Sequence, residues 1–316
     1  MNKGLFHKAK PWLFLLPVAA IVAAFRFAPM LYALTMSFYD WGLAGAQRFL
    51  GLGNYAALLR DERFGQALLN TVHYVIGVVP TGLFLALFIA LLLNQKVRAR
   101  GLFRTAYFLP VITSTVAISL VWKWIFNPRI GLANQLLQGL GLPASPWLDE
   151  SRGLLNLLLA PTGAELPRLL AGPSLAMCAI IIMSVWHHLG YNVLIFLAGL
   201  QSIPQYYYEA ASLDGAGRWQ SFRHVTWPLL SPTTFYVLLM TSITSFQMFI
   251  QVYTMEGPTG GNPQGTTRTL VYYLYEKGFA EWEMGYANAI AFALFLIILA
   301  LTLVQRRVVE KRVHYQ

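Results

Sequence analysis

Six long apolar runs constrain the fold of this chain more than any other feature of its sequence. A helix needs about 20 apolar residues to cross the roughly 30 Å hydrocarbon core of a bilayer. Only 11% of the 316 residues are charged, whereas a soluble domain carries about 25%, so a water-soluble globule is excluded. The sequence predicts an all-α polytopic membrane protein with one transmembrane domain over residues 1–316. The six predicted spans are Pro11–Phe38, Thr71–Leu93, Ala106–Phe126, Ser174–Leu200, Thr233–Thr254 and Gly285–Val304.

Lysine and arginine are distributed unequally between the two sides of the predicted bundle. Both termini and two of the connections are rich in lysine and arginine, whereas the other connections balance their basic residues with acidic ones. By the positive-inside rule, both termini and the connection 201–232 are therefore predicted to be cytoplasmic. The long connection 127–173 is then extracytoplasmic, either as an ordered lid or as an insertion. Membrane topology explains the net charge of +10 without nucleic acid. The basic residues on the cytoplasmic side are Lys3, Lys8, Lys10, Lys96, Arg98, Arg100, Arg104, Arg218, Arg223, Arg306, Arg307, Lys311 and Arg312.

Sequence signatures of enzymes are missing. The chain has no G-x-x-x-x-G-K-[ST], H-E-x-x-H or G-x-S-x-G motif, so it is not expected to bind ATP by that loop or to hold a catalytic site. Its single cysteine, Cys178, excludes an intrachain disulfide and a cysteine metal cluster. We therefore expect no metal and no cofactor in this chain. The thirteen acidic residues all lie outside the six predicted spans, which disfavours an ion-coupled carrier.

A polar segment, Glu209–Pro232, separates the fourth and fifth apolar runs. Ser202 is predicted to cap a short helix that has Pro204 in its first turn. Gly215 is expected to end this helix in a left-handed conformation. A second short helix is predicted from about Arg218.

The same segment carries a spaced motif. It begins with E-A-A, followed after three residues by G, after nine more by an aliphatic residue, and after one more by an apolar residue and P. Two alanines leave a shallow surface that another protein can approach, beside the carboxylates of Glu209 and Asp214. The motif resembles the cytoplasmic EAA loop of bacterial ABC importer permeases. FLAGLQSIPQYYYEAASLDGA, TRTLVYYLYEKGF and GYANAIAFALFLI resemble the carbohydrate branch, including the larger maltose-transporter permease and the glycerol-3-phosphate and multiple-sugar permeases. The motif residues are Glu209, Ala210, Ala211, Gly215, Val225, Trp227 and Pro228.

The resemblance extends from about Trp12 to Arg307 and departs from the family after the fifth span, where the usual T-x-GGP turn is replaced by MEGPTGGNPQGT. It implies a type I permease in the bacterial inner membrane that works with a second permease, a solute-binding protein and a pair of cytoplasmic ATPases, which bind ATP and Mg. It further implies ATP-driven import of a sugar or oligosaccharide. Glycerol 3-phosphate is the alternative substrate, and an ion-coupled sugar carrier is the alternative class. The implied ATPase-coupling residues are Glu209, Ala210, Ala211, Asp214, Gly215 and Pro228.

Polar residues recur at helical intervals in the fourth and fifth runs. Neutral hydrogen-bonding groups beside aromatic rings suit a sugar, although such groups also bond between membrane helices. Arg26 stands near the middle of the first run. It is expected to reach the interface or helix carbonyls, with binding of an anionic group as the alternative. The predicted substrate-path residues are His187, Tyr191, Asn192, Ser242, Ser245, Gln247 and Gln251.

Overall fold

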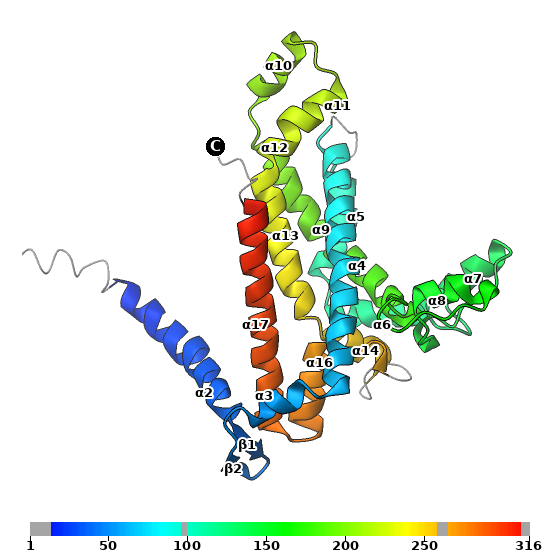
Figure 1. The fold of residues 1–316 in the computed structure, drawn as a ribbon. Helices are drawn as coiled ribbons and strands as arrows, with labels where there is room; N and C mark the ends of the chain where they lie inside the picture. The colour runs from blue at the N-terminus through cyan, green and yellow to red at the C-terminus, as the bar shows by residue number, and fades with distance from the viewer. Residues whose placement is uncertain (1–13, 96–99, 258–264, 311–316) are drawn as a thin grey trace, which may run out of the picture. The chain divides into compact units, whose positions relative to one another are not determined.

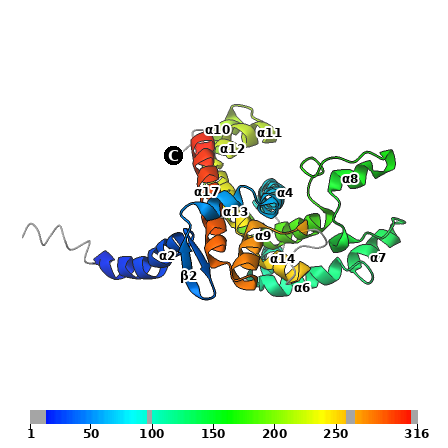
Figure 2. The ribbon, with the colours of Figure 1, turned by 60° about the horizontal axis from the view of Figure 1, so that its bottom comes forward.

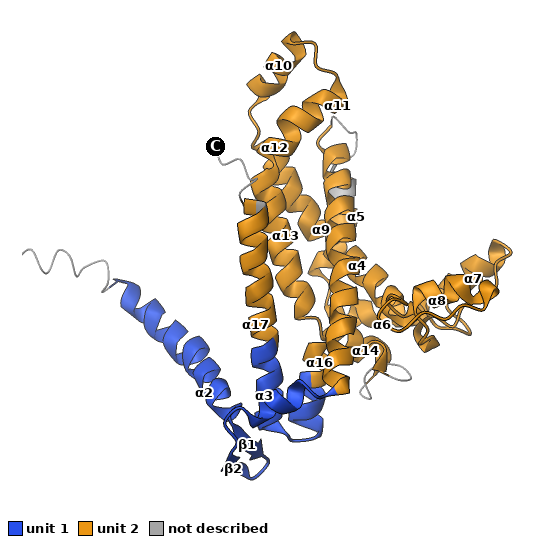
Figure 3. Cartoon of the chain, viewed as in Figure 1, with its two compact units in different colours: residues 1–61, 274–293 blue, residues 62–273, 294–316 orange. Residues whose placement is uncertain are grey.

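The structure, a computed structural model, describes residues 14–95, 100–257 and 265–310, and these residues are mostly helical (Figure 1). They belong to two compact units, formed by residues 1–61 with 274–293 and by residues 62–273 with 294–316 (Figure 3). Several basic residues that support the predicted orientation lie outside the described residues, namely Lys3, Lys8, Lys10, Lys96, Arg98, Lys311 and Arg312. Most of the MEGPTGGNPQGT segment, where the chain departs from the family, also lies outside them.

The first unit begins with a helix over Phe14–Met36, none of whose apolar window is buried within the chain. This helix contains a π-helical turn, η1 (Ala23–Phe27), followed by α2 (Ala28–Met36). Pro29 has no backbone N–H, and its ring would collide with a carbonyl one turn earlier in a regular helix. The chain widens instead, and the N–H of Ala28 bonds the carbonyl of Ala23. Arg26 lies in this wide turn and is exposed.

The rest of the first unit is a compact group of short elements that follows that helix. The antiparallel strands β1 (Tyr39–Gly42) and β2 (Gly45–Phe49) form a hairpin. Asn54 donates from its side-chain amide to the carbonyl oxygens of Ser37 (2.9 Å) and Tyr39 (3.0 Å). These bonds fix the base of the hairpin, because they satisfy carbonyls that the strand pairing leaves free. The remaining elements are α3 (Gly53–Leu58), the π-helical η5 (Glu276–Ala280) and the first turns of α17 (Met284–Val309).

Helix α9 (Leu175–Gln201) is the most buried candidate span. Three glycines lie where α9 contacts neighbouring helices, and a side chain at any of them would collide with the neighbour. A Cβ on Gly77 of α4 (Glu62–Leu93) would touch Ile181 of α9. Likewise, a Cβ on Gly190 would overlap the backbone of α5 (Arg100–Ile112), and one on Gly199 the Thr233 side chain of α13 (Ser231–Phe246). Helices in lipid gain stability from such close packing, so these glycines position the bundle around α9.

Four helices in the described residues are long and apolar enough to cross a membrane, or up to six if each of two bent pairs is one span. The predicted third span is one bent pair, broken after Ile112 and turned by 108° into α6 (Thr115–Ile125). Pro110 lies inside α5, and the extended backbone of Ser114 starts α6. The second bent pair ends in α13, with a bend of 62°.

The predicted fifth span also differs in its end, because α13 stops at Phe246. A separate helix, α14 (Ile250–Glu256), follows, and α16 (Leu270–Tyr275) lies beyond it. The carbonyl freed at Met248 accepts a hydrogen bond from Thr269 Oγ1 at 3.1 Å. The break is therefore satisfied by protein rather than left open to lipid.

The connection 127–173 forms a folded arm that projects sideways from the helices of its own unit in both views (Figures 1 and 2). Leu148, in η2, belongs to the same hydrophobic cluster as Phe126 and Met177, and Trp147 packs against that cluster, which joins the root of the arm to α9. The elements of the arm are α7 (Leu132–Gly139), η2 (Trp147–Asp149), α8 (Leu154–Leu159) and η3 (Ala160–Thr162).

Gly190→Ala is expected to destabilise the bundle, because the added Cβ would overlap the carbonyl oxygen of Tyr107. Overpacking of this kind costs about 1–3 kcal/mol. Thermal unfolding of the purified chain in detergent should show a lower midpoint. Gly82→Ala in α4 is the matched control, since nothing lies within 4 Å of its added Cβ. Equal midpoints for the two variants would contradict the close approach of α5 and α9.

Candidate functional site

The motif segment folds as a helix, a tight turn and a second helix. Helix α10 (Gln205–Leu213) is terminated by Gly215, two residues beyond its last residue, whose φ of 78° confirms the predicted left-handed conformation. The N–H of Gly215 bonds the carbonyl of Ser212 (3.1 Å), and the N–H of Ala216 bonds that of Ala211 (2.9 Å). This pair of bonds is a Schellman motif, which satisfies the last carbonyls of the helix and fixes the exit direction of the chain.

The start of α10 differs from the prediction. Ser202 donates its hydroxyl to the carbonyl of Gly199 (2.8 Å) at the end of α9, so it does not cap α10. The N-cap residue of α10 is Pro204. A serine hydroxyl can bond backward or forward along the chain, and here the last turn of α9 takes it.

The second helix, α11 (Arg218–Ser221), begins where the sequence predicts. It continues through the π-helical η4 (Phe222–Thr226) into α12 (Trp227–Leu229). Pro228 again follows a wide turn, in which the N–H of Trp227 bonds the carbonyl of Phe222. The hydroxyls of Tyr208 and Thr226 lie 3.1 Å apart and join α10 to η4. The two helical parts of the motif segment are therefore held together as one body.

A cleft of about 480 Å³ opens between α10 and η4. Ala210, Ala211, Asp214 and Gly215 line it, whereas Glu209 and Pro228 do not. Glu209 lies on α10 with its side chain exposed. The sequence reasoning missed three polar or aromatic residues that also line this cleft, namely Tyr207, Gln220 and His224.

Local bonds shape the polar groups around the cleft. Gln220 Oε1 accepts from the backbone N–H of Gly217 at 2.7 Å, and the His224 Nδ1 lies 3.0 Å from the carbonyl oxygen of Gln220. The ring centres of Tyr206 and Tyr207 lie 4.2 Å apart, and the hydrogen bond between their hydroxyls raises the pKa of Tyr206. Asp214 is the one acidic residue among those that line the cleft.

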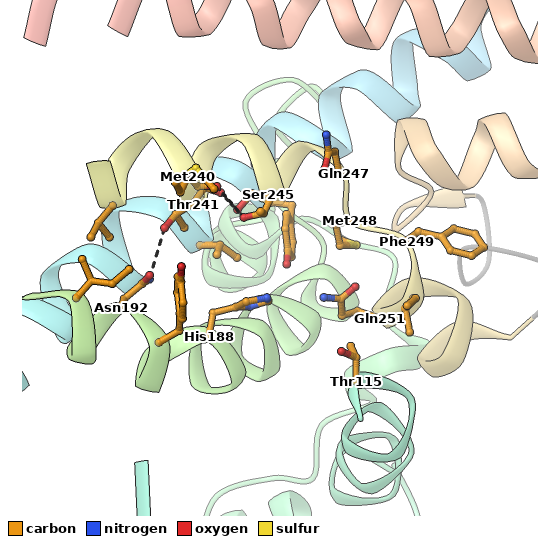
Figure 4. A pocket seen from close by; sticks show the side chains of 17 residues that line it. Thr115, His188, Asn192, Met240, Thr241, Ser245, Gln247, Met248, Phe249 and Gln251 are labelled. Atoms are coloured by element: carbon orange, nitrogen blue, oxygen red, sulfur yellow. Dashed lines mark hydrogen bonds between the residues drawn. The ribbon is translucent and has the colours of Figure 1, made fainter. Parts of the chain in front are cut away.

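A second cavity, of about 540 Å³, lies within the bundle (Figure 4). Helices α4, α9 and α13 and the break between α13 and α14 supply most of its wall. Asn192 Nδ2 donates to Thr241 Oγ1 at 3.5 Å across α9 and α13. His188 and Gln251 point toward one another in Figure 4. The volume is in the range of small-molecule sites, and the wall mixes apolar side chains with a few polar groups.

Five of the seven residues predicted for the substrate path line this cavity, and two do not. Ser242 accepts a hydrogen bond from Gln305 Nε2 of α17 at 3.0 Å, so it bonds a neighbouring helix. His187 is buried, with its ring 4.9 Å from that of His188. The five lining residues are Tyr191, Asn192, Ser245, Gln247 and Gln251.

The sequence reasoning missed other polar residues of the same cavity. His188 lines it from α9, and Thr241 and Thr244 line it beside Ser245 on α13. A helix period of 3.6 residues places 241, 244 and 245 on one face. The spacing of the hydroxyl residues in the sequence therefore contained a signal for Thr241 and Thr244. Thr115, at the start of α6, gave no such signal.

Comparison with known proteins gives a family and close relatives. Residues 49–314 match the family described as binding-protein-dependent transport system inner membrane component. The chain is 36% identical to the arabinooligosaccharides transport system permease protein AraP of Bacillus subtilis, over 96% of this chain and 90% of that one. It is 33% identical to the sn-glycerol-3-phosphate transport system permease protein UgpA of Agrobacterium fabrum, over 98% of this chain and 97% of that one.

A solved structure shares the fold. A chain of a bacterial alginate ABC transporter, crystallised in complex with its alginate pentasaccharide-bound periplasmic protein, superposes with a TM-score of 0.75 at 22% identity. The match covers 96% of each chain.

Thiol accessibility should separate the cavity wall from the helix contacts. In a Cys178→Ser background, Thr244→Cys and Tyr191→Cys are expected to react with a small water-soluble thiol reagent. Ser242→Cys, which replaces a hydroxyl two residues from Thr244 on the same helix, should react at least about tenfold more slowly, because it packs against α17 and its thiol is kept from ionising. Fast labelling of Ser242→Cys with protection of the other two would contradict the assignment.

Proposed function

We propose that this chain, which belongs to the family of binding-protein-dependent transport system inner membrane components, is the sugar-conducting permease of an ATP-driven importer. The observation that carries the proposal is the motif segment, which folds as one body around a cleft and continues through α12 into α13. The chain itself acts as a transport subunit. ATP and Mg are bound by a partner ATPase pair.

In this proposal each bent helix pair is one crossing, so the chain has six spans and both termini are cytoplasmic. The support for the count is that each pair, taken together, is long and apolar enough for a span. The support for the orientation is the distribution of lysine and arginine. The motif segment then faces the cytoplasm, where the ATPases are.

The motif segment docks on an ATPase. Alanines at 210 and 211 keep the cleft wall shallow, and the exposed Glu209 offers a carboxylate to a basic group of the partner. Because the Schellman turn and the Tyr208–Thr226 bond hold the segment rigid, a displacement of α10 moves η4 with it. Closure of the ATPases thereby favours one of two permease conformations, as alternating access requires.

A sugar or oligosaccharide is the proposed substrate. An extracytoplasmic solute-binding protein delivers it, and this chain transports it together with a second permease subunit. AraP, a relative at 36% identity, is named for arabinooligosaccharides. The cavity offers amide, hydroxyl and imidazole groups beside Tyr191 and Phe249, which suits hydroxyls and C–H faces. Glycerol 3-phosphate, suggested by the UgpA relative, is the second candidate. The residues that line the cavity include neither lysine nor arginine, which favours a neutral sugar.

Glu209→Lys is expected to reduce uptake at least about tenfold while the protein still inserts. The change removes a charge-assisted hydrogen bond worth about 1.5–3 kcal/mol and places a cation against a basic group. Uptake of labelled sugar and co-purification of the ATPase measure the effect. Glu310→Lys, the same reversal near the end of α17, is the control and should transport normally. Normal uptake by Glu209→Lys, with the ATPase bound at wild-type stoichiometry, would refute the docking role.

Gly215→Val is expected to uncouple ATP hydrolysis from substrate. A β-branched residue at φ 78° is strained by about 1 kcal/mol or more, which misaims α11. Gly215→Asn should retain coupling, since asparagine tolerates the left-handed region and nothing lies within 4 Å of an added Cβ. The measurement is ATPase activity of the reconstituted complex with and without loaded binding protein. Retained stimulation in Gly215→Val would show that the turn does not set the coupling.

A further inference from the structure

A second cleft at the motif segment, of about 490 Å³, lies where this segment meets the ends of α4 and α9. Among the residues that the structure describes, it shares Ala216 alone with the cleft between α10 and η4. Successive residues of a helix point about 100° apart, so Tyr207 lines the first cleft and its neighbour Tyr208 lines this one. The motif segment therefore presents two different surfaces.

The charge in the second cleft is positive. Of the described residues that line it, Arg218 alone is charged, whereas the acidic Asp214 lines the other cleft. The Arg218 side chain is exposed and forms no ion pair within the described part of the chain. A guanidinium presents five N–H donors in a planar fork, which matches the oxygens of a phosphate group. This cleft is thus suited to an anion.

Two neutral hydrogen-bond donors line the same cleft. They are Asn94, which directly follows α4, and Ser221 in α11. Neither side chain makes a hydrogen bond to another described residue. The hydroxyls of Tyr208 and Thr226, in contrast, bond each other at 3.1 Å and form a fixed part of the wall. An amide and a hydroxyl can therefore donate to the oxygens of an anion that Arg218 leaves free.

The rest of the wall is apolar. Leu200, at the end of α9, is buried, and Leu91, in the last turn of α4, packs against the same hydrophobic cluster. Phe222 of η4 lies beside them in the wall. Both α4 and α9 are candidate spans, and the motif segment lies at one end of the helices of its own unit (Figure 1). The cleft is therefore at the level of lipid head groups, where a phospholipid would use the polar and the apolar wall and a free phosphate only the polar one.

We infer that the second cleft binds the head group of an anionic phospholipid from the cytoplasmic leaflet. Arg218 binds the phosphate, Asn94 and Ser221 donate to its remaining oxygens or to the glycerol, and the acyl chains begin beside Leu91. Basic pockets between membrane helices on the cytoplasmic side bind such head groups. The choice of leaflet rests on the orientation given under the proposed function. Because the lipid contacts the end of α4 and α11 at once, it holds the motif segment against the neighbouring span.

The test titrates the purified full-length chain, in a neutral detergent, with phosphatidylglycerol or with phosphatidylcholine, and native mass spectrometry measures the bound lipid. We expect tighter binding of phosphatidylglycerol. Arg218→Gln should weaken this binding at least about tenfold, because it removes charge-assisted bonds to the phosphate, and Arg218→Lys should weaken it less. Arg223→Gln is the matched control, since Arg223 is exposed on η4 and lines neither cleft. It should bind phosphatidylglycerol as the unchanged chain does.

Three outcomes would overturn the lipid site. Equal losses in Arg218→Gln and Arg223→Gln would show attraction by the overall positive charge rather than by a cleft. Displacement of the lipid by excess inorganic phosphate would assign the cleft to a soluble phosphate compound. Loss of bound lipid on adding the ATPase pair, together with weaker ATPase association of Arg218→Gln, would assign the cleft to that partner. Lipid binding in detergent requires neither transport nor a particular orientation, so a failure of the proposed transport function is distinguishable from a failure of the lipid site.

Discussion

The constraint on which the rest of this structure depends is that lipid offers no hydrogen bonds to a backbone. Every interruption of a membrane helix must then be repaired by the protein. In η1 and η4 the residue before a proline bonds a carbonyl five residues back, Ala28 to Ala23 and Trp227 to Phe222. The wide turn removes the collision between the proline ring and the helix without losing a donor. Proline is therefore accommodated in both helices by local widening rather than by a broken chain.

Interruptions that cannot be repaired locally are repaired by a neighbour. The carbonyl of Met248, freed between α13 and α14, is bonded by Thr269. Thr71 in α4 accepts from the N–H of Leu270 at 3.0 Å, which satisfies the start of α16. Irregular backbone of this kind is tolerated at membrane depth where it lines a cavity. The break after Phe246 does so, because Gln247 to Gln251 form part of the cavity wall.

The parts of the structure that depend on short stretches of sequence could be predicted. Apolar runs gave the long helices, and Gly215 with Arg218 gave the turn and the second helix of the motif, since each depends on a few neighbouring residues. Helix breaks were missed because hydropathy averages over a window, so the turn between Ile112 and Thr115 leaves the apolar signal intact.

The assignment of polar residues to the cavity was harder, because the period of a helix does not tell which face meets which neighbour. Ser242 and Thr241 are adjacent in sequence and differ by about 100° around α13. Ser242 accepts a hydrogen bond from Gln305 of α17, whereas Thr241 accepts one from Asn192 beside the cavity. His187 and His188 differ in the same way. Only the packing of α9 against its neighbours, determined in part by Gly190 and Gly199, decides between such pairs.

The continuity of the chain between the two candidate sites bears on how they communicate. The segment that lines the cleft of the motif, η4, runs through α12 into α13, and the next three turns of α13 carry Val237, Thr241 and Thr244 to the cavity. The single large bend on this path, 62°, falls at Leu230, which is fully buried against α9. A buried bend cannot absorb a displacement by fraying into solvent. In the proposed coupling, a movement imposed on α10 is passed through the Tyr208–Thr226 bond to α13, so that the cavity wall moves with the cleft.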